Sequence, residues 1–455
     1  MPIFEWRSAM PASADEVFTY HARPGAFRRL APPWQKMRVL EETGDVTDGR
    51  VAFDVWFGPV KRHWLAEMGS AVPGRQFVDR QLEGPFASWE HTHRFVPDGD
   101  DRSDLLDHVE YSLPAGGLID FVGEGPAGKT LARLFRFRHE RTRLDLRRHA
   151  QWADRPRLKL AIAGASGLIG SHLTDYLTTA GHRVVRLVRN KEAGPDEISW
   201  DPSTGALYHG ALEGIDAIVN LAAVSLFGVW TPGRKKAILS SRVHSTRTLA
   251  EAIARMESPP AVFINPSAVG AYGSRGDETI NEQTPRGEGF LADVCRAWEE
   301  AANPARDAGV RVVTPRQGIV ISAAGGALAT MSLPFKAGLG GRLGAGDQYW
   351  SWVALDDLLA AFEWTLHDEE LEGVVNFTSA EPVTNREFTK TLGHVLRRPA
   401  ALAAPAFVLR HGLGGLGDQM LLASQRAFPG RLEERGFPFS FPDLEGALRY
   451  ELGRG

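Results

Sequence analysis

Three glycines with the spacing Gly-x-x-Gly-x-x-Gly lie between a short apolar run and the start of an amphipathic helix pattern. The segment reads Gly164, Ala165, Ser166, Gly167, Leu168, Ile169 and Gly170. In such a segment the first glycine permits a tight turn, the second lets the backbone approach a pyrophosphate, and the third lets the helix pack close to the sheet. The helix N-terminus adds unpaired amides and a positive dipole end. The sequence therefore predicts a dinucleotide site at this turn.

The end of the next predicted strand carries Arg189, with Lys191 nearby. An NAD(H) site usually places an acid here to bind the ribose 2′-hydroxyl, whereas a guanidinium holds a 2′-phosphate through two parallel hydrogen bonds. These residue types favour NADP(H) over NAD(H). The alternative is that Arg189 belongs to a solvated loop.

A parallel sheet would position these groups. Strand patterns occur at 158–163, 184–188, 217–221, 262–265 and 310–313, and helix patterns separate them. Strands that alternate with helices indicate an α/β fold with a doubly wound parallel sheet, which is the Rossmann type.

A polar stretch at 145–157, which contains a proline, marks a domain boundary. Before it, a helix start and several strand patterns separated by turns predict an α+β domain over residues 1–150. We assign residues 157–398 to the nucleotide-binding domain and residues 399–455 to a small C-terminal domain. A chain of 455 residues is too long for a single core, which fits this division.

Composition excludes several classes of protein. The 52 basic and 56 acidic residues give a net charge of -4, which offers no electrostatic reason to expect a nucleic-acid partner. Cys295 is the only cysteine, which excludes an intrachain disulfide and a multi-cysteine zinc site. No apolar run is long enough to span a membrane and the N-terminus does not resemble a signal peptide, so we expect a cytoplasmic protein.

A predicted helix at 129–148 is rich in arginine. Its arginines are Arg133, Arg136, Arg138, Arg141, Arg143, Arg147 and Arg148. Because charge runs are usually solvated, we expect an exposed helix face. Contact with an anionic surface is the alternative.

From Leu158 onward the chain resembles the extended or atypical short-chain dehydrogenases/reductases. Within them it resembles the NAD-dependent epimerase/dehydratase family, in the subgroup of "epimerase family" or SulA-type proteins. The matching stretches include GASGLIG at 164–170, WTPGRKKAILSSRV at 230–243, SAVGAYG at 267–273, GGRLGAGDQYWSWVALDDL at 340–358 and PGRLEERGFPF at 429–439. The resemblance implies that Leu221, Ala222 and Ala223 line the cofactor.

The resemblance also places a catalytic serine at Ser267, whose hydroxyl would polarise a substrate oxygen. A strand-end cap is the alternative. The superfamily normally uses a Tyr-x-x-x-Lys helix, in which lysine lowers the tyrosine pKa. The aligned helix at 290–298 contains neither residue, as in the subgroup. Tyr272 is the nearest substitute phenol, although it would equally suit packing against substrate or nicotinamide.

Two further residues are predicted to bind substrate. Arg242 falls where many relatives carry an asparagine, and it would hold an anionic substrate group. An exposed helix charge is the alternative. Trp350 lies, like Asp356 and Asp357, where relatives form the substrate-side lobe. Its ring would stack on a sugar or another ring, with core packing as the alternative.

The N-terminal part resembles the SRPBCC, or START-like, superfamily through the stretches at 11–34, 77–95 and 107–116. This resemblance implies a sheet wrapped around a C-terminal helix, with an apolar cavity for a hydrophobic ligand. His91 and His93 share one strand face. A metal site built with His63 or His108 is conceivable, but ordinary sheet histidines are favoured and no metal is predicted.

Two functions follow. The first is an NADP(H)-dependent oxidoreductase or epimerase that acts on a small molecule, either a nucleotide sugar or a hydrophobic carbonyl or alcohol. The second is a non-catalytic protein that senses NADP(H), which the missing Tyr/Lys pair favours.

Overall fold

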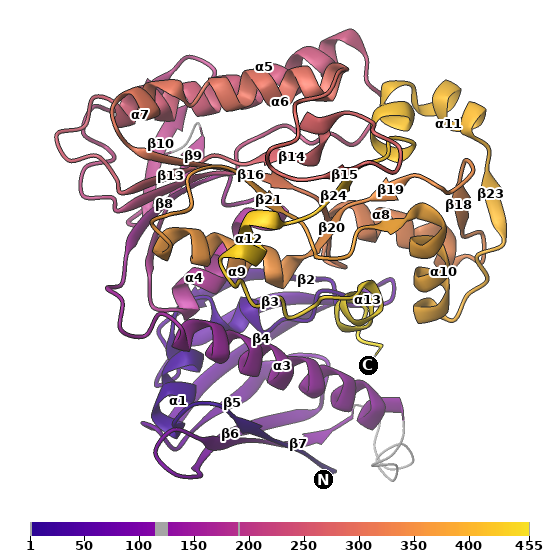
Figure 1. Cartoon of the computed structure of the whole chain (residues 1–455). Helices are drawn as coiled ribbons and strands as arrows, with labels where there is room; N and C mark the ends of the chain where they lie inside the picture. The colour runs from indigo at the N-terminus through magenta and orange to yellow at the C-terminus, as the bar shows by residue number, and fades with distance from the viewer. Residues whose placement is uncertain (1, 114–125, 190–191, 455) are drawn as a thin grey trace.

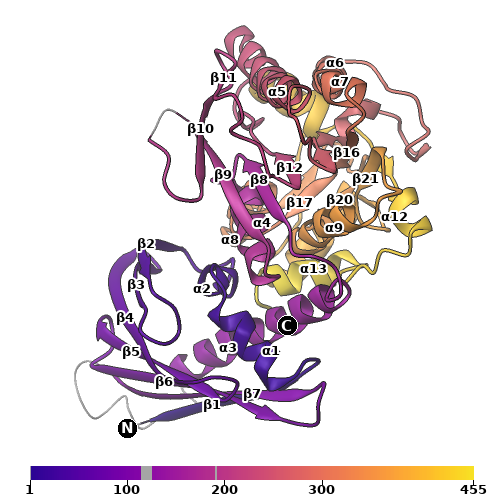
Figure 2. The same cartoon turned by 90° about the vertical axis from the view of Figure 1, so that its left-hand side faces the viewer.

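The computed structural model describes residues 2–113, 126–189 and 192–454. Its N-terminal part is a curved antiparallel sheet that wraps around one long helix (Figures 1 and 2). The strands lie in the order β1 (Ile3–Met10), β7 (Ser103–Ser112), β6 (Ser88–Pro97), β5 (Gln76–Glu83), β4 (Val60–Val72), β3 (Arg50–Phe57) and β2 (Met37–Thr43). The helices are α1 (Ala14–Ala22), α2 (Ala26–Arg29) and α3 (Pro126–Ala150).

Alternation along the strands defines the inner face of this sheet. In β7, Leu105, Asp107, Val109 and Tyr111 are buried, and the residues that alternate with them are half-buried. Leu131 and Phe135 of α3 pack on this face. The arrangement confirms the predicted fold, in which a sheet wraps around a C-terminal helix.

The second part is a mainly parallel sheet with helices on both faces. Its strands run β11 (Ala206–Leu207), β10 (Glu197–Asp201), β9 (Arg183–Arg189), β8 (Lys159–Ala163), β12 (Ala217–Asn220), β13 (Val262–Ile264), β16 (Arg311–Gln317) and β14 (Ser267–Ala268), and β21 (Gly373–Phe377) also pairs with β16. The five strands expected from the sequence are present within a few residues of their predicted bounds. The doubly wound Rossmann fold is therefore confirmed.

Successive residues of each strand face opposite layers, because side chains alternate across a sheet. Leu160 and Ile162 pack against α4 (Leu168–Thr179) and α9 (Leu355–His367). Ala161 and Ala163 face the layer formed by α5 (Pro232–Ile253), α6 (Phe290–Glu300) and α7 (Asn303–Asp307).

A smaller lobe is built mostly from residues that follow β16 in the chain, together with the earlier strand at Thr279–Ile280. It combines short strand pairs with helices, and many but not all of these elements pack around one apolar cluster. The pairs are β15 (Thr279–Ile280) with β24 (Arg426–Ala427), β17 (Ile319–Ile321) with β20 (Trp352–Ala354), β18 (Gly341–Leu343) with β23 (Leu402–Ala404), and β19 (Tyr349–Trp350) with β22 (Val383–Thr384). The helices are α8 (Gly326–Lys336), α10 (Asn385–Leu396), α11 (Ala406–Leu413), α12 (Gly430–Glu434) and α13 (Leu444–Glu451). Residues after 399 are thus interleaved with earlier strands.

Buried ion pairs connect the two parts of the chain. Arg29 of α2 lies 2.7 Å from Asp145 of α3 and 2.7 Å from Asp356 of α9. Arg141 lies 2.8 Å from the second oxygen of Asp356, and Arg148 lies 2.6 Å from Asp357. These side chains are at most 6% exposed.

The prediction of an exposed, solvated face on α3 is therefore wrong for Arg141 and Arg148. Arg136 and Arg147 are exposed as expected. The reason is that α3 lies between its own sheet and the Rossmann domain, so its outer face meets Asp356 and Asp357 instead of water (Figure 2). Those two aspartates belong to the domain contact, not to a substrate surface. Among the described residues, no helix is long and apolar enough to cross a membrane.

Candidate cofactor and active site

The glycine turn connects β8 to α4, and at Gly164 and Gly170 the surrounding backbone leaves no room for a Cβ. Gly164 has φ +78°, and a Cβ there would lie 2.5 Å from the carbonyl carbon of Leu221. At Gly170 a Cβ would overlap the carbonyl oxygen of Gly164. Gly167 is the N-cap of α4 and provides no side-chain cap. The first amides of α4 are therefore available to a phosphate, as the cradle for a dinucleotide requires.

The other predicted cofactor residues lie at the same sheet edge. Parallel pairing aligns Ala163 with Asn220 and with Leu187, so the chain after each of these strands leaves the sheet at one edge. There Leu221 and Ala222 are half-buried and Ala223 is exposed. Arg189 ends β9 with an exposed side chain, and Lys191 lies outside the described residues. The turn, Arg189 and residues 221–223 are thus brought together.

A buried amide network supports this edge. The Asn220 side-chain amide donates to the Thr246 hydroxyl at 2.9 Å and to the Asn265 carbonyl oxygen at 3.1 Å. Ser245 donates to the carbonyl of Ala222 at 3.1 Å. The structural roles of Thr246, Asn265 and Ser245 were not predicted from sequence. An asparagine at the end of each of two buried strands is the signal that could have indicated them.

Ser267 begins the short strand β14, just beyond the end of β13. Its side chain is buried, and its hydroxyl lies close enough to the Cys295 thiol and the Glu299 carboxylate to lower the pKa of both, although it makes no well-aligned hydrogen bond within the described part of the chain. Burial raises the pKa of the neighbouring Cys295 thiol, and the Ser267 hydroxyl offsets only part of that rise. Cys295 is therefore a neutral thiol at physiological pH, as expected for a buried helix residue. Ser267 is thus a hydroxyl with a hydrogen bond still to give, and Trp298 Nε1 nearby is also without a partner in the described chain.

Tyr272 lies close to Ser267 in sequence but points into the protein. It is fully buried, and its hydroxyl donates to the Asn376 carbonyl oxygen at 2.7 Å. The Arg316 guanidinium lies 4.6 Å from the ring centroid and pairs with Glu299 through two bonds of 3.0 Å. Burial raises the Tyr272 pKa, and Arg316 offsets only part of this effect. This direction is opposite to the lowering that a Tyr-Lys pair produces.

Arg242 is buried on α5, so the alternative of an exposed helix charge is wrong. It donates to the carbonyls of Val224 and Ile238, both at 3.0 Å, and lies over the Trp298 ring. Burial lowers its pKa to about 10. No carboxylate pairs with Arg242 among residues 2–113, 126–189 and 192–454. The contact with Val224 places this unneutralised cation beside the segment that follows Ala223.

Trp350 packs in a different part of the protein from Ser267, Tyr272 and Arg242. It is 3% exposed and contacts Phe388 in the apolar cluster between α8 and α10. Packing in that cluster explains why the Trp350 ring is buried. A contact of Trp350 with substrate stays a prediction.

The strand order and the glycine turn define the class of protein: the second part is a Rossmann domain of the short-chain dehydrogenase/reductase type. A family model for the NAD dependent epimerase/dehydratase family matches residues 160–376. An epimerase family protein from Mycobacterium bovis is 42% identical over 296 residues, which cover 65% of this chain and 98% of that protein. The chain belongs to the NAD dependent epimerase/dehydratase family, which makes it an NAD(P)-dependent type of protein.

Two other family models match the flanking parts. Polyketide cyclase / dehydrase and lipid transport matches residues 10–135, and a domain of unknown function matches residues 404–451. The N-terminal part is thus an SRPBCC-type domain.

Two solved structures are similar to this chain. A nucleoside-diphosphate sugar epimerase from Corynebacterium glutamicum has a TM-score of 0.83 and 32% identity, with 99% of this chain and 90% of that chain covered. Human epimerase family protein SDR39U1 with NADPH has a TM-score of 0.60 and 32% identity, with 65% of this chain and 99% of that chain covered.

Proposed function

We propose that this chain binds NADP(H) at the glycine turn and catalyses hydride transfer to or from an oxygen-bearing carbon of a small molecule. The observation that carries the proposal is the buried hydroxyl of Ser267, which makes no well-aligned hydrogen bond in the described chain. Bound nicotinamide would supply or accept the hydride. The protein itself would orient the substrate and donate a hydrogen bond from the Ser267 hydroxyl to the substrate oxygen.

Two substrate classes are supported by different observations. A nucleotide sugar fits the similarity to the Corynebacterium epimerase, and its diphosphate would suit the unneutralised Arg242. A hydrophobic carbonyl or alcohol fits the N-terminal domain, whose family model includes lipid transport and which would hold a hydrophobic ligand. The proposed roles of Arg242 and Trp350 are to bind the substrate.

The preference for NADP(H) rests on Arg189 and on the human relative, whose structure contains NADPH. Arg189→Ala is expected to weaken NADPH binding roughly 10- to 100-fold, because hydrogen bonds to a charged group contribute about 1.5–3 kcal/mol. NADH binding should change little, since NADH lacks the 2′-phosphate. Titration calorimetry with both coenzymes measures the difference. Equal losses for the two coenzymes would show that Arg189 does not contact the 2′-phosphate.

Sensing of NADP(H) without catalysis is the second candidate. The buried Tyr272 hydroxyl favours it, because this phenol is bonded to Asn376 and the usual Tyr-x-x-x-Lys pair is absent. A sensor would bind NADPH tightly and leave it unconsumed.

NADPH absorbance followed over a panel of carbonyl compounds and nucleotide sugars separates these candidates. Ser267→Ala should lower kcat on the order of 100-fold while NADPH affinity is kept, as when one oxyanion donor is removed. Tyr272→Phe should lower kcat less than Ser267→Ala does if Tyr272 only positions Asn376 and Arg316. It should lower kcat by as much if Tyr272 transfers the proton. An inactive wild type that binds NADPH, with both variants unchanged in binding, would establish the sensor.

A further inference from the structure

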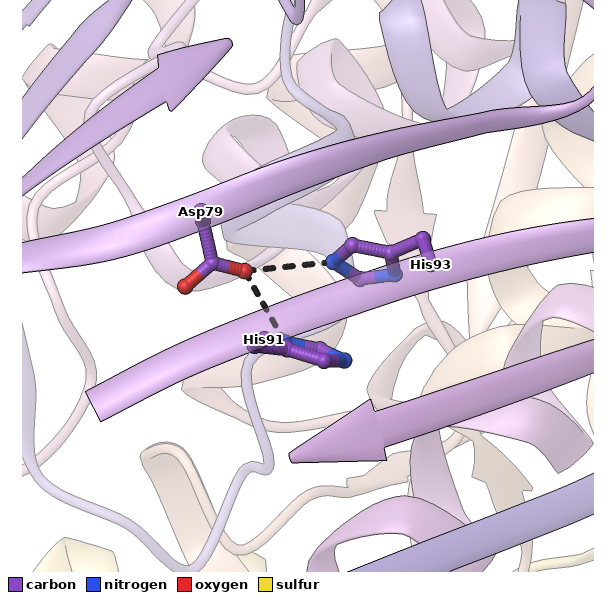
Figure 3. Close-up of side chains that lie close together, drawn as sticks. All are labelled: Asp79, His91 and His93. Carbon is purple, nitrogen blue, oxygen red and sulfur yellow. Dashed lines mark hydrogen bonds and ion pairs between the residues drawn. The ribbon is translucent and has the colours of Figure 1, made fainter. Parts of the chain in front are cut away.

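Two imidazoles and two carboxylates face one another on the N-terminal sheet. Figure 3 shows both imidazoles and one of the carboxylates, that of Asp79. His91 and His93 lie on one face of β6, with their ring centroids 3.8 Å apart. Asp79 is the cross-strand partner of His91 on β5, and Asp107 is the partner of His93 on β7. Both rings are almost completely buried, at 1% and 2% exposed.

Each ring has a carboxylate at both of its nitrogens. Asp79 Oδ2 lies 2.9 Å from His91 Nδ1 and 3.2 Å from His93 Nε2. Asp107 Oδ1 lies 3.1 Å from His91 Nε2 and 2.8 Å from His93 Nδ1. A neutral imidazole carries a single N–H, so two neutral rings leave two nitrogen lone pairs facing carboxylate oxygens. Burial makes that arrangement costly unless positive charge is added.

The two carboxylates are not equivalent. Asp107 is held at its other oxygen by His139 Nε2 of α3 at 2.7 Å, so it lies deep between sheet and helix. Asp79 is half-buried at 16% side-chain exposure, and its Oδ1 accepts a bond from Trp89 Nε1 at 3.2 Å. Asp79 therefore directs Oδ2 toward both rings from the more open side. Asp107 Oδ1 faces the far nitrogens of both rings at ion-pair distance, without a well-aligned hydrogen bond to either.

We infer that Asp79, His91 and His93 bind one divalent first-row transition-metal ion, and that Asp107 orients both rings from behind. Two imidazole nitrogens and one carboxylate oxygen are a donor set that such ions prefer. A carboxylate that accepts the second N–H of a ligating histidine is the usual outer partner of such a site. Candidate ligand atoms of the three residues lie within 4.8 Å of one another. Three protein ligands leave coordination positions for water or for an oxygen of a bound molecule.

The site differs from the one conceivable from sequence. His108 pairs with Glu5 and Glu110, and His63 is 44% exposed beside Asp54, so neither joins this cluster. The sequence prediction of no metal is the opposite of this proposal.

A second cluster, of His182, Glu363 and His367, is less suited to an ion. The amide of Leu158 donates to His182 Nδ1 at 3.0 Å, so a neutral His182 carries its proton on Nε2. That nitrogen is the one that faces Glu363.

The test uses the full chain, stripped with a chelator, dialysed and titrated with Co²⁺. Wild type should show a saturable visible absorption at one ion per chain, and Zn²⁺ should displace it. Asp79→Asn and His93→Gln should abolish the uptake. Asp107→Asn should weaken Co²⁺ binding about 10- to 100-fold, as loss of an outer partner does. His63→Gln, on the neighbouring strand β4, is the matched control and should bind as wild type.

Absence of saturable Co²⁺ and Zn²⁺ uptake by folded wild type would overturn the proposal, and so would equal binding by wild type and Asp79→Asn. Nitrogen NMR of the imidazoles distinguishes the competing arrangement, in which both rings are doubly protonated and no ion binds. If the variants fail to fold, metal content and Co²⁺ titration of wild type still decide the matter, with His367→Gln used to exclude the second cluster.

Discussion

Asp356→Asn is expected to lower the free energy of unfolding by about 3–5 kcal/mol, because it removes one partner from a buried ion cluster. One carboxylate oxygen of Asp356 pairs with Arg29, and the other pairs with Arg141. All three side chains are at most 2% exposed. Asp145 would still neutralise Arg29. Among the described carboxylates, Arg141 would retain Glu451 alone, at 4.0 Å, together with its hydrogen bonds to the Tyr450 hydroxyl and the Arg29 carbonyl. Denaturant unfolding followed by tryptophan fluorescence measures the loss.

Asp347→Asn is the matched control for this substitution. Asp347 also pairs with an arginine, Arg386, at 2.7 Å, but its side chain is 72% exposed. Exposed ion pairs contribute little to stability, so this variant should unfold like wild type. Equal stabilities of the Asp347 and Asp356 variants would show that the cluster is not what joins the two domains.

Gly170→Ala is expected to abolish the stabilisation of the chain by NADPH. An added methyl group would overlap the carbonyl oxygen of Gly164 and lie 2.9 Å from the Ala165 Cα, so the turn would have to shift. Overpacking of this kind costs about 1–3 kcal/mol of stability and displaces the amides that face the pyrophosphate. The rise in Tm with NADPH measures the effect.

Gly233→Ala provides a comparison in another first helical turn. No atom lies within 4 Å of a Cβ at Gly233, so this variant should respond to NADPH as wild type does. An unchanged response in Gly170→Ala would argue that the coenzyme does not bind at the turn.

Most of the Rossmann domain could be predicted because its signals are local. Strand and helix periods alternate along the chain, and parallel pairing then brings the ends of β8, β9 and β12 to one edge. Arg189 and residues 221–223 therefore reach the glycine turn without any long-range information. The burial of Arg141 and Arg148 could not be predicted, because it depends on Asp356 and Asp357, more than two hundred residues along the chain.

The candidate site was harder to predict where side-chain direction matters. The sequence places Tyr272 near Ser267, but only the fold shows its hydroxyl bonded to Asn376. The shared face of His91 and His93 follows from strand alternation. Their partner Asp79 depends on which residues of β5 and β6 are paired, and sequence spacing does not contain that register.

The position of α3 has a consequence for how such chains can be recombined. Curated relatives such as the Mycobacterium bovis protein match only 65% of this chain, although 98% of their own length is covered. In this chain α9 carries Asp356 and Asp357, and arginines of the N-terminal domain neutralise both carboxylates. Attaching a different N-terminal domain to this Rossmann domain would therefore succeed only if the incoming helix brought its own guanidinium groups to those positions.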